Sequence, residues 1–124
     1  MAVTPVPRIL VVDDDRTTLR MLSLQLKAAG YGVATARDGA AALARLASAR
    51  FDLVLLDVWM PGMDGLEVLA RLRGMPSRPR VVVMTADDTP DTLLKAVREH
   101  AFRYVTKPVE PAELNAVVAS VLAA

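Results

Sequence analysis

A chain of 124 residues with a hydrophobic fraction of 53% and a net charge of +1 can form one compact domain with its own core. The balanced charge provides no general attraction to nucleic acid or to a membrane surface, and the lack of cysteine excludes disulfides and thiolate chemistry. One histidine cannot form a multi-histidine zinc site. Without a signal-peptide pattern or an apolar run near the roughly 18 residues of a membrane span, we expect a cytoplasmic protein.

Strand and helix patterns alternate along the chain, which favours an α/β domain with a parallel sheet. We expect a short leader over residues 1–7 and one domain over residues 8–124. The strand-like runs of β-branched and apolar residues lie at 9–12, 53–56, 81–84 and 104–106, with a weaker, edge-like pattern at 32–36.

Capping residues indicate where five helices begin. Asp15 and Asp38 precede the first two apolar stripes as N-caps, and Pro90 and Pro111 stand at the first positions of the last two helices, where a missing N–H is harmless. The third helix follows a loop at 61–65. The residues expected to face inward on the third and fifth helices are Leu66, Leu69 and Ala70, and Leu114, Val117, Val118, Val121 and Leu122.

Carboxylates follow two of the expected strands at the point where each strand ends. Asp13 and Asp14 come after the first strand, and Asp57 comes after the third. If these strands are neighbours, their carboxyl ends lie roughly 5 Å apart at one edge of the sheet. Carboxylates that close repel one another without a cation, and Mg²⁺ prefers such oxygen ligands. The sequence therefore predicts a magnesium site, whereas Asp15 is interpreted as a helix cap.

The same edge carries the groups that phosphate chemistry needs. Asp57 is the candidate nucleophile, because a carboxylate can attack phosphorus and form an aspartyl phosphate. Thr85 and Lys107 follow the fourth and fifth strands and offer a hydroxyl and a mobile positive charge to phosphate oxygens. Each residue alone is weak evidence, since strands often end in such residues at solvent. Their coincidence at the ends of separate strands indicates a phosphate site.

Four motifs together resemble the receiver domain of two-component response regulators, in the CheY-like superfamily. They are Ile9–Asp14, Leu55–Gly65 with its Asp-x-x-Met-Pro-x-Met-Asp-Gly pattern, Met84–Ala86 and Tyr104–Pro108. The resemblance extends from about Arg8 to the fifth helix. It implies a flavodoxin-like, doubly wound fold, with a five-stranded parallel sheet of order 2-1-3-4-5 flanked by five helices.

The resemblance also implies a role for each site residue. Asp57 would accept a phosphoryl group from a histidine kinase, a histidine phosphotransfer protein or a small phosphodonor. Thr85 and Lys107 would bind the phosphoryl oxygens, Tyr104 would be the aromatic switch that turns inward, and the peptide bond before Pro108 would be cis. The implied ligands of Mg²⁺, or of Mn²⁺, are Asp13, Asp14, Asp57 and the backbone carbonyl of Trp59.

The function implied by this resemblance is a switch between inactive and active conformations. Such a domain is not an enzyme acting on other molecules, since it catalyses only its own phosphorylation and dephosphorylation. Its output would be a downstream protein or an output domain, bound through the fourth helix, fifth strand and fifth helix, a face that can also form a homodimer. We expect no direct contact with nucleic acid or with a membrane.

The chain departs from the family pattern at residues 100–104, where His-Ala-Phe-Arg-Tyr replaces the frequent Gly-Ala-x-x-Tyr. The missing glycine would alter the turn after the fourth helix. Trp59 and Asp87 flank the path of an attacking water, so we expect them to set the lifetime of the phosphoryl group.

Three other functions compete with that of a receiver. A haloacid-dehalogenase-type phosphatase needs a second aspartate where this chain has Trp59. A flavodoxin-type FMN site is disfavoured, because the acids at 13–15 would repel its phosphate. A receiver fold that serves as a docking module without phosphoryl turnover remains the alternative, although the intact set of site residues argues against it.

Overall fold

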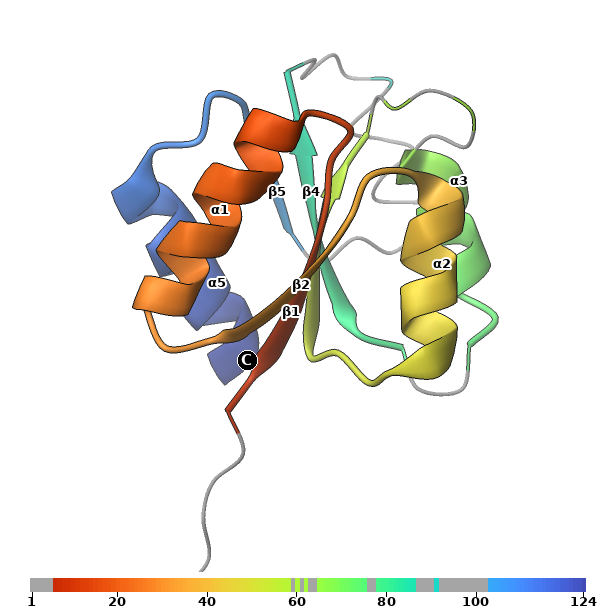
Figure 1. Ribbon diagram of the computed structural model, residues 1–124, viewed down its shortest axis with the longest axis horizontal. Coiled ribbons are helices and arrows are strands. Elements are labelled where there is room, and N and C mark those ends of the chain that lie inside the picture. The colour runs from red at the N-terminus through yellow and green to blue at the C-terminus, as the bar shows by residue number, and fades with distance from the viewer. Residues whose placement is uncertain are drawn as a thin grey trace, which may run out of the picture.

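A computed structural model describes residues 6–58, 60, 62, 65–75, 78–86, 91 and 103–124. Its core is a five-stranded sheet in the order β2-β1-β3-β4-β5 (Figure 1). The strands are β1 (Arg8–Val12), β2 (Gly32–Ala36), β3 (Leu53–Asp57), β4 (Arg80–Thr85) and β5 (Arg103–Thr106). All neighbouring strands are parallel. The predicted strands, their order and the edge position of β2 are confirmed.

Helices cover both faces of this sheet in the described part of the chain. They are α1 (Arg16–Ala28), α2 (Gly39–Ser48), α3 (Gly65–Leu72) and α5 (Pro111–Ala123). Figure 1 shows α1 and α5 on one face and α2 and α3 on the other. The helix predicted to begin at Pro90 lies outside the described residues. Among the described helices, none has the length and apolar character needed to cross a membrane.

The sheet buries apolar side chains on both faces, which explains the unbroken apolar runs in the sequence. Leu10 and Val12 point into the core beneath α2 and α3, whereas Ile9 and Val11 point into the core beneath α1 and α5. The central strand β3 is buried along its whole length. The apolar stripe of α5 packs inward as predicted, with Leu122 only partly buried.

Both predicted aspartate caps are present. Asp15 Oδ1 accepts a hydrogen bond from the Thr17 N–H at 2.9 Å, and Asp38 Oδ1 accepts one from the Ala41 N–H at 2.7 Å. The bond from Thr17 stabilises the charged carboxylate and holds the pKa of Asp15 below its usual value. Gly30 follows α1 with a φ of 99°, a conformation that favours glycine after a helix.

The inward face of α3 differs from the prediction. Ala70 is exposed, and the described residues that α3 buries are Gly65, Val68, Leu69 and Leu72. These positions follow the spacing i, i+3, i+4 and i+7 from the first residue of the helix. The prediction for Ala70 was wrong because a helix that buries Val68, Leu69 and Leu72 on one face turns Ala70 towards solvent. The side chain of Leu66 lies outside the described part.

Candidate functional site

The sheet brings the predicted site residues to the carboxyl ends of four strands. Asp13 follows β1, Asp57 ends β3, Thr85 ends β4 and Lys107 follows β5. Backbone hydrogen bonds extend the strand pairing past the strand ends and so hold this edge in place. The Asp13 N–H donates to the Ala36 carbonyl at 3.1 Å, and the Lys107 N–H donates to the Thr85 carbonyl at 2.8 Å.

Three carboxylates form a compact acidic group. Asp13, Asp14 and Asp57 each offer an oxygen, and these oxygens lie within 4.8 Å of one another. Asp13 and Asp57 are buried, whereas Asp14 is exposed. Asp13 Oδ1 accepts the Asp15 N–H at 2.9 Å, which orients its carboxylate. A cluster of hard oxygen donors with excess negative charge fits a small divalent cation such as Mg²⁺.

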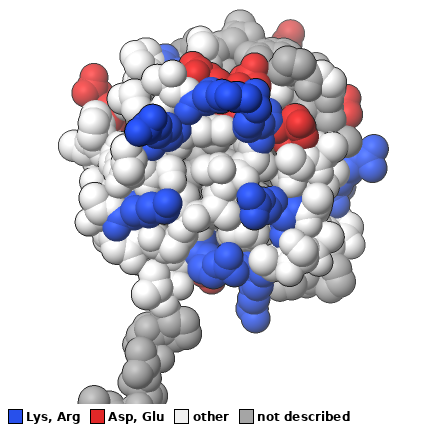
Figure 2. Space-filling model, in the orientation of Figure 1, with Lys and Arg blue, Asp and Glu red and all other residues white. Residues whose placement is uncertain are grey.

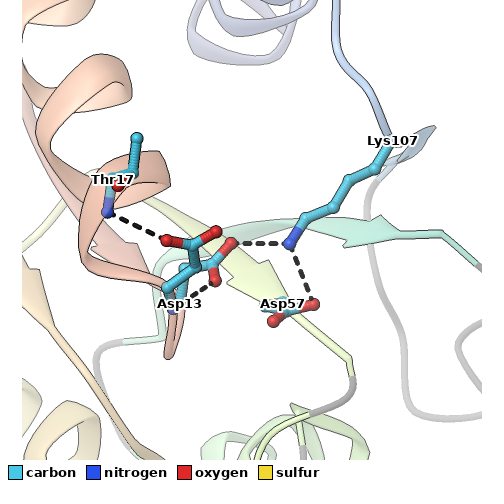
Figure 3. Close-up of polar contacts among 5 residues, drawn as sticks. Asp13, Thr17, Asp57 and Lys107 are labelled. Carbon is cyan, nitrogen blue, oxygen red and sulfur yellow. Dashed lines mark hydrogen bonds and ion pairs between the residues drawn. The ribbon is translucent and has the colours of Figure 1, made fainter.

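Lys107 extends across the edge of the sheet to this acidic group. Its Nζ lies 2.6 Å from Asp13 Oδ2 and 3.3 Å from Asp57 Oδ1 (Figure 3). The peptide bond between Lys107 and Pro108 is cis, as the family resemblance implied. One ammonium does not balance three carboxylates, so the cluster keeps a net negative charge that a divalent ion can neutralise.

The surroundings of Asp57 make its carboxylate unusually basic. Burial and the negative charge of Asp13 raise its pKa to about 6, although Lys107 acts in the opposite direction. Burial alone would lower the pKa of Lys107, but its bond to Asp13 and the charge of Asp57 leave that pKa raised. At neutral pH Asp57 is therefore mostly ionised and is more basic than an ordinary carboxylate, as suits a nucleophile.

The pKa of Asp57 gives a prediction about stability. The folded-state pKa of about 6 exceeds the unfolded value near 4, so the folded state binds this proton more tightly. The resulting stabilisation is complete below about pH 4 and is lost as the pH rises through 6. In metal-free buffer Asp57→Asn should stabilise the domain at pH 7 by about 1–2 kcal/mol, after allowance for solvent screening.

Urea unfolding at pH 4 to 7 with a chelator measures this difference. The increase in the free energy of unfolding caused by Asp57→Asn should shrink towards zero at pH 4. Asp15→Asn is the control, because the pKa of that exposed carboxyl is lowered in the folded state. Replacing it should therefore bring no increase in the free energy of unfolding as the pH rises. A gain for Asp57→Asn that does not change with pH would contradict the prediction.

Two further residues were predicted to act as switch residues. Thr85 is fully buried at the end of β4, next to Thr106 in the register of β5. Tyr104 is 48% exposed, so its ring lies at the surface rather than in the core. Trp59, Asp87 and His100 lie outside the described residues. The roles assigned to these residues stay predictions.

Comparisons with known proteins identify the family. The profile described as "Response regulator receiver domain" matches residues 9–119. The chain belongs to this receiver-domain family. Regulatory protein AtoC of Escherichia coli (strain K12) is 40% identical over 115 residues, which are 93% of this chain and 25% of AtoC. The chain spans a quarter to a half of the length of such curated relatives.

Two solved structures show the same fold at similar size. Chemotaxis protein CheY4 of Vibrio cholerae superposes with a TM-score of 0.88 at 32% identity, covering 94% of this chain and 99% of CheY4. Response regulator protein TrrA of Thermotoga maritima, solved in complex with Mg²⁺-BeF, gives a TM-score of 0.84 at 34% identity, with coverage of 94% and 99%. This receiver domain therefore matches the whole length of both solved chains.

Gly65 supports the site in a way that the sequence analysis of this receiver domain missed. Its N–H donates to the Val58 carbonyl at 2.8 Å, at the start of α3. A Cβ at this position would overlap the Asp57 carbonyl oxygen and lie 2.8 Å from the Val58 Cα. The backbone that follows the candidate nucleophile thus packs directly on a residue without a side chain. The signal for this role in the sequence was Gly65 itself, the glycine of the Asp-Gly pair that ends the Leu55–Gly65 motif.

Gly65→Ala should therefore destabilise the fold by about 1–3 kcal/mol, because the added methyl group displaces rigid backbone. Gly74→Ala is the matched control. Its Cβ would meet the Arg71 carbonyl oxygen at 3.8 Å, an ordinary contact. Urea unfolding of both variants measures the difference in free energy. Equal stability of the two variants would show that the close approach at Gly65 relaxes without cost.

Proposed function

We propose that this receiver domain accepts a phosphoryl group on Asp57 from the phosphohistidine of a histidine kinase or phosphotransfer protein, or from a small phosphodonor. An Asp57 carboxylate oxygen forms the new P–O bond, and the bond from phosphorus to the donor breaks, so that its electron pair leaves with the donor. The observation that carries this proposal is a buried carboxylate with a pKa of about 6, placed beside a second carboxylate and the Lys107 ammonium.

Asp13, Asp14 and Asp57 would hold Mg²⁺, or Mn²⁺, with the Trp59 carbonyl as the further ligand implied by the family pattern. The close spacing of the three carboxylates and their excess charge support this assignment. When bound, the ion supplies positive charge that neutralises the phosphoryl oxygens during transfer. The similarity to TrrA, whose structure contains Mg²⁺-BeF, gives further support.

The chain's own residues would then detect the phosphoryl group. The Lys107 ammonium, now 2.6 Å from Asp13, would bind a phosphoryl oxygen, and the Thr85 hydroxyl would bind another. As Thr85 moves towards the phosphoryl group, the ring of Tyr104 would turn inward from its exposed position. The added charge would thereby shift the balance between two conformations.

The output would pass through the face of β5, α5 and the expected fourth helix to a downstream protein, an output domain or a second copy. AtoC is about four times as long as the matched segment, which supports an output carried outside this domain. We infer that the domain acts in the cytoplasm, does not itself contact nucleic acid, and catalyses no reaction beyond its own phosphorylation and dephosphorylation.

The test uses the single tryptophan of the chain, which lies two residues after Asp57 in sequence. Addition of Mg²⁺ and then beryllofluoride should change Trp59 fluorescence, and Asp57→Asn should remove the change that depends on beryllofluoride. Asp38→Asn is the matched control, because it removes a nearby charge while asparagine still caps α2. Unchanged fluorescence, together with no acid-labile phosphate on Asp57, would exclude the switch and favour the docking module.

A further inference from the structure

Two adjoining hollows lie near the amino-terminal ends of β1, β3 and β4, whereas Asp57 lies at the carboxyl end of β3. Each has a volume of about 460 Å³, within the range of about 300–1,000 Å³ that small-molecule sites occupy. Arg50, Phe51 and Pro79 line both hollows, so the two adjoin. Because β3 has five residues at about 3.3 Å each, roughly 15 Å separates them from the acidic group.

The first, here called the basic hollow, is lined by Arg50, Arg78, Arg80 and Asp52. Arg80 has a structural task, since its Nη1 donates to the Val121 carbonyl at 2.7 Å near the end of α5, whose last turn has no basic residue. Arg50 and Arg78 are exposed, and neither forms a hydrogen bond or ion pair with another described residue. Figure 2 shows basic side chains at the bottom of the view, and acidic and basic side chains together at the top.

The second, here called the apolar hollow, is lined mainly by hydrophobic side chains that include Leu46, Phe51, Met75 and Pro79. Phe51 is buried, and the Arg8 guanidinium lies 4.9 Å from the centre of its ring. This stacking holds the aromatic ring in place at the boundary between the two hollows. An apolar surface of this kind suits a flat ring system rather than a charged group.

From this juxtaposition we propose that the paired hollows bind a nucleoside phosphate. The base lies in the apolar hollow, and the phosphate lies between the Arg50 and Arg78 guanidinium groups, which match phosphate oxygens in geometry. The Asp52 carboxylate, which accepts the Arg8 N–H at 2.8 Å, also accepts a ribose hydroxyl.

The experiment titrates the whole chain with ADP while amide NMR shifts are recorded, with a chelator present so that no metal links the ligand to the acidic group. Adenosine and pyrophosphate are titrated separately as the apolar and the anionic parts of the ligand. We expect ADP to bind more tightly than either part and to shift residues at both hollows. Pyrophosphate binding as tightly as ADP would overturn the proposal, because a bare anion site would then suffice.

The variant Arg50→Ala with Arg78→Ala should weaken ADP binding at least about tenfold, because two charge-assisted contacts are lost. The matched control is Arg20→Ala with Arg45→Ala, which removes the same charge from exposed positions on α1 and α2. It should change the affinity by no more than about twofold. Equal losses in both variants, or no ADP binding at millimolar concentration, would overturn the proposal.

The apolar hollow is tested by Met75→Gln, which makes the surface beside the proposed base polar without adding charge and should weaken ADP but not pyrophosphate; equal ADP affinity in this variant and the unaltered chain would overturn the placement of the base. Asp57→Asn should bind ADP as the unaltered chain does, because Asp57 ends β3 whereas the hollows lie before its first residue. If ADP does not bind, the proposal that Asp57 accepts a phosphoryl group is therefore unaffected. Conversely, a chain that takes no phosphoryl group could still bind ADP.

Discussion

Asp57→Asn should abolish acid-labile phosphorylation of this receiver domain, with a loss of at least about a thousandfold in the rate of phosphoryl uptake. The amide has nearly the shape of the carboxylate but lacks the negative oxygen that attacks phosphorus. Neither Asp13 nor Asp14 should replace Asp57, because Asp13 is bound to Lys107 at 2.6 Å and Asp14 is exposed.

The measurement is incorporation of phosphate from labelled acetyl phosphate in the presence of Mg²⁺, followed by acid and base treatment of the product. Asp52→Asn is the control, because it replaces an aspartate five residues away at the other end of β3. This control should be phosphorylated at the normal rate. Residual acid-labile phosphate on Asp57→Asn would place the acceptor on another carboxylate.

Asp13→Asn should weaken Mg²⁺ binding by about 10–100-fold, because it removes a full negative charge from a buried position in the acidic group. This loss of Mg²⁺ affinity should exceed the loss caused by replacing an exposed acid, since solvent screens a buried charge less. The variant also removes the strongest partner of Lys107, whose Nζ lies 2.6 Å from Asp13 and 3.3 Å from Asp57. Lys107 should then pair with Asp57 alone.

Titration with Mg²⁺, followed by amide NMR shifts, measures the affinity directly and needs no phosphodonor. Asp15→Asn is the matched control, because Asp15 belongs to the same loop, is exposed, and caps α1 through an oxygen that asparagine also provides. That control should change the affinity by about twofold at most. An equal loss in both variants would indicate a diffuse field of negative charge rather than a set of specific ligands.

Much of the fold could be read from local patterns. Apolar runs located four of the strands and a weaker, edge-like pattern located β2, and the aspartates before α1 and α2 marked where those helices begin. The inward face of α3 was mistaken at Ala70, because the helix buries Val68 and Leu72 beside Leu69, and this face turns Ala70 outward. The predicted fourth helix remains a prediction.

The sequence by itself determined which residues could carry phosphate chemistry, since strand ends and residue types are local properties of the chain. Only the tertiary structure decided how those residues act on one another. It places Lys107 against Asp13 from 94 positions away, and it buries Asp57 enough to raise its pKa to about 6. Coulomb and desolvation energies depend on distance and burial, which arise only when separate strands and helices pack together.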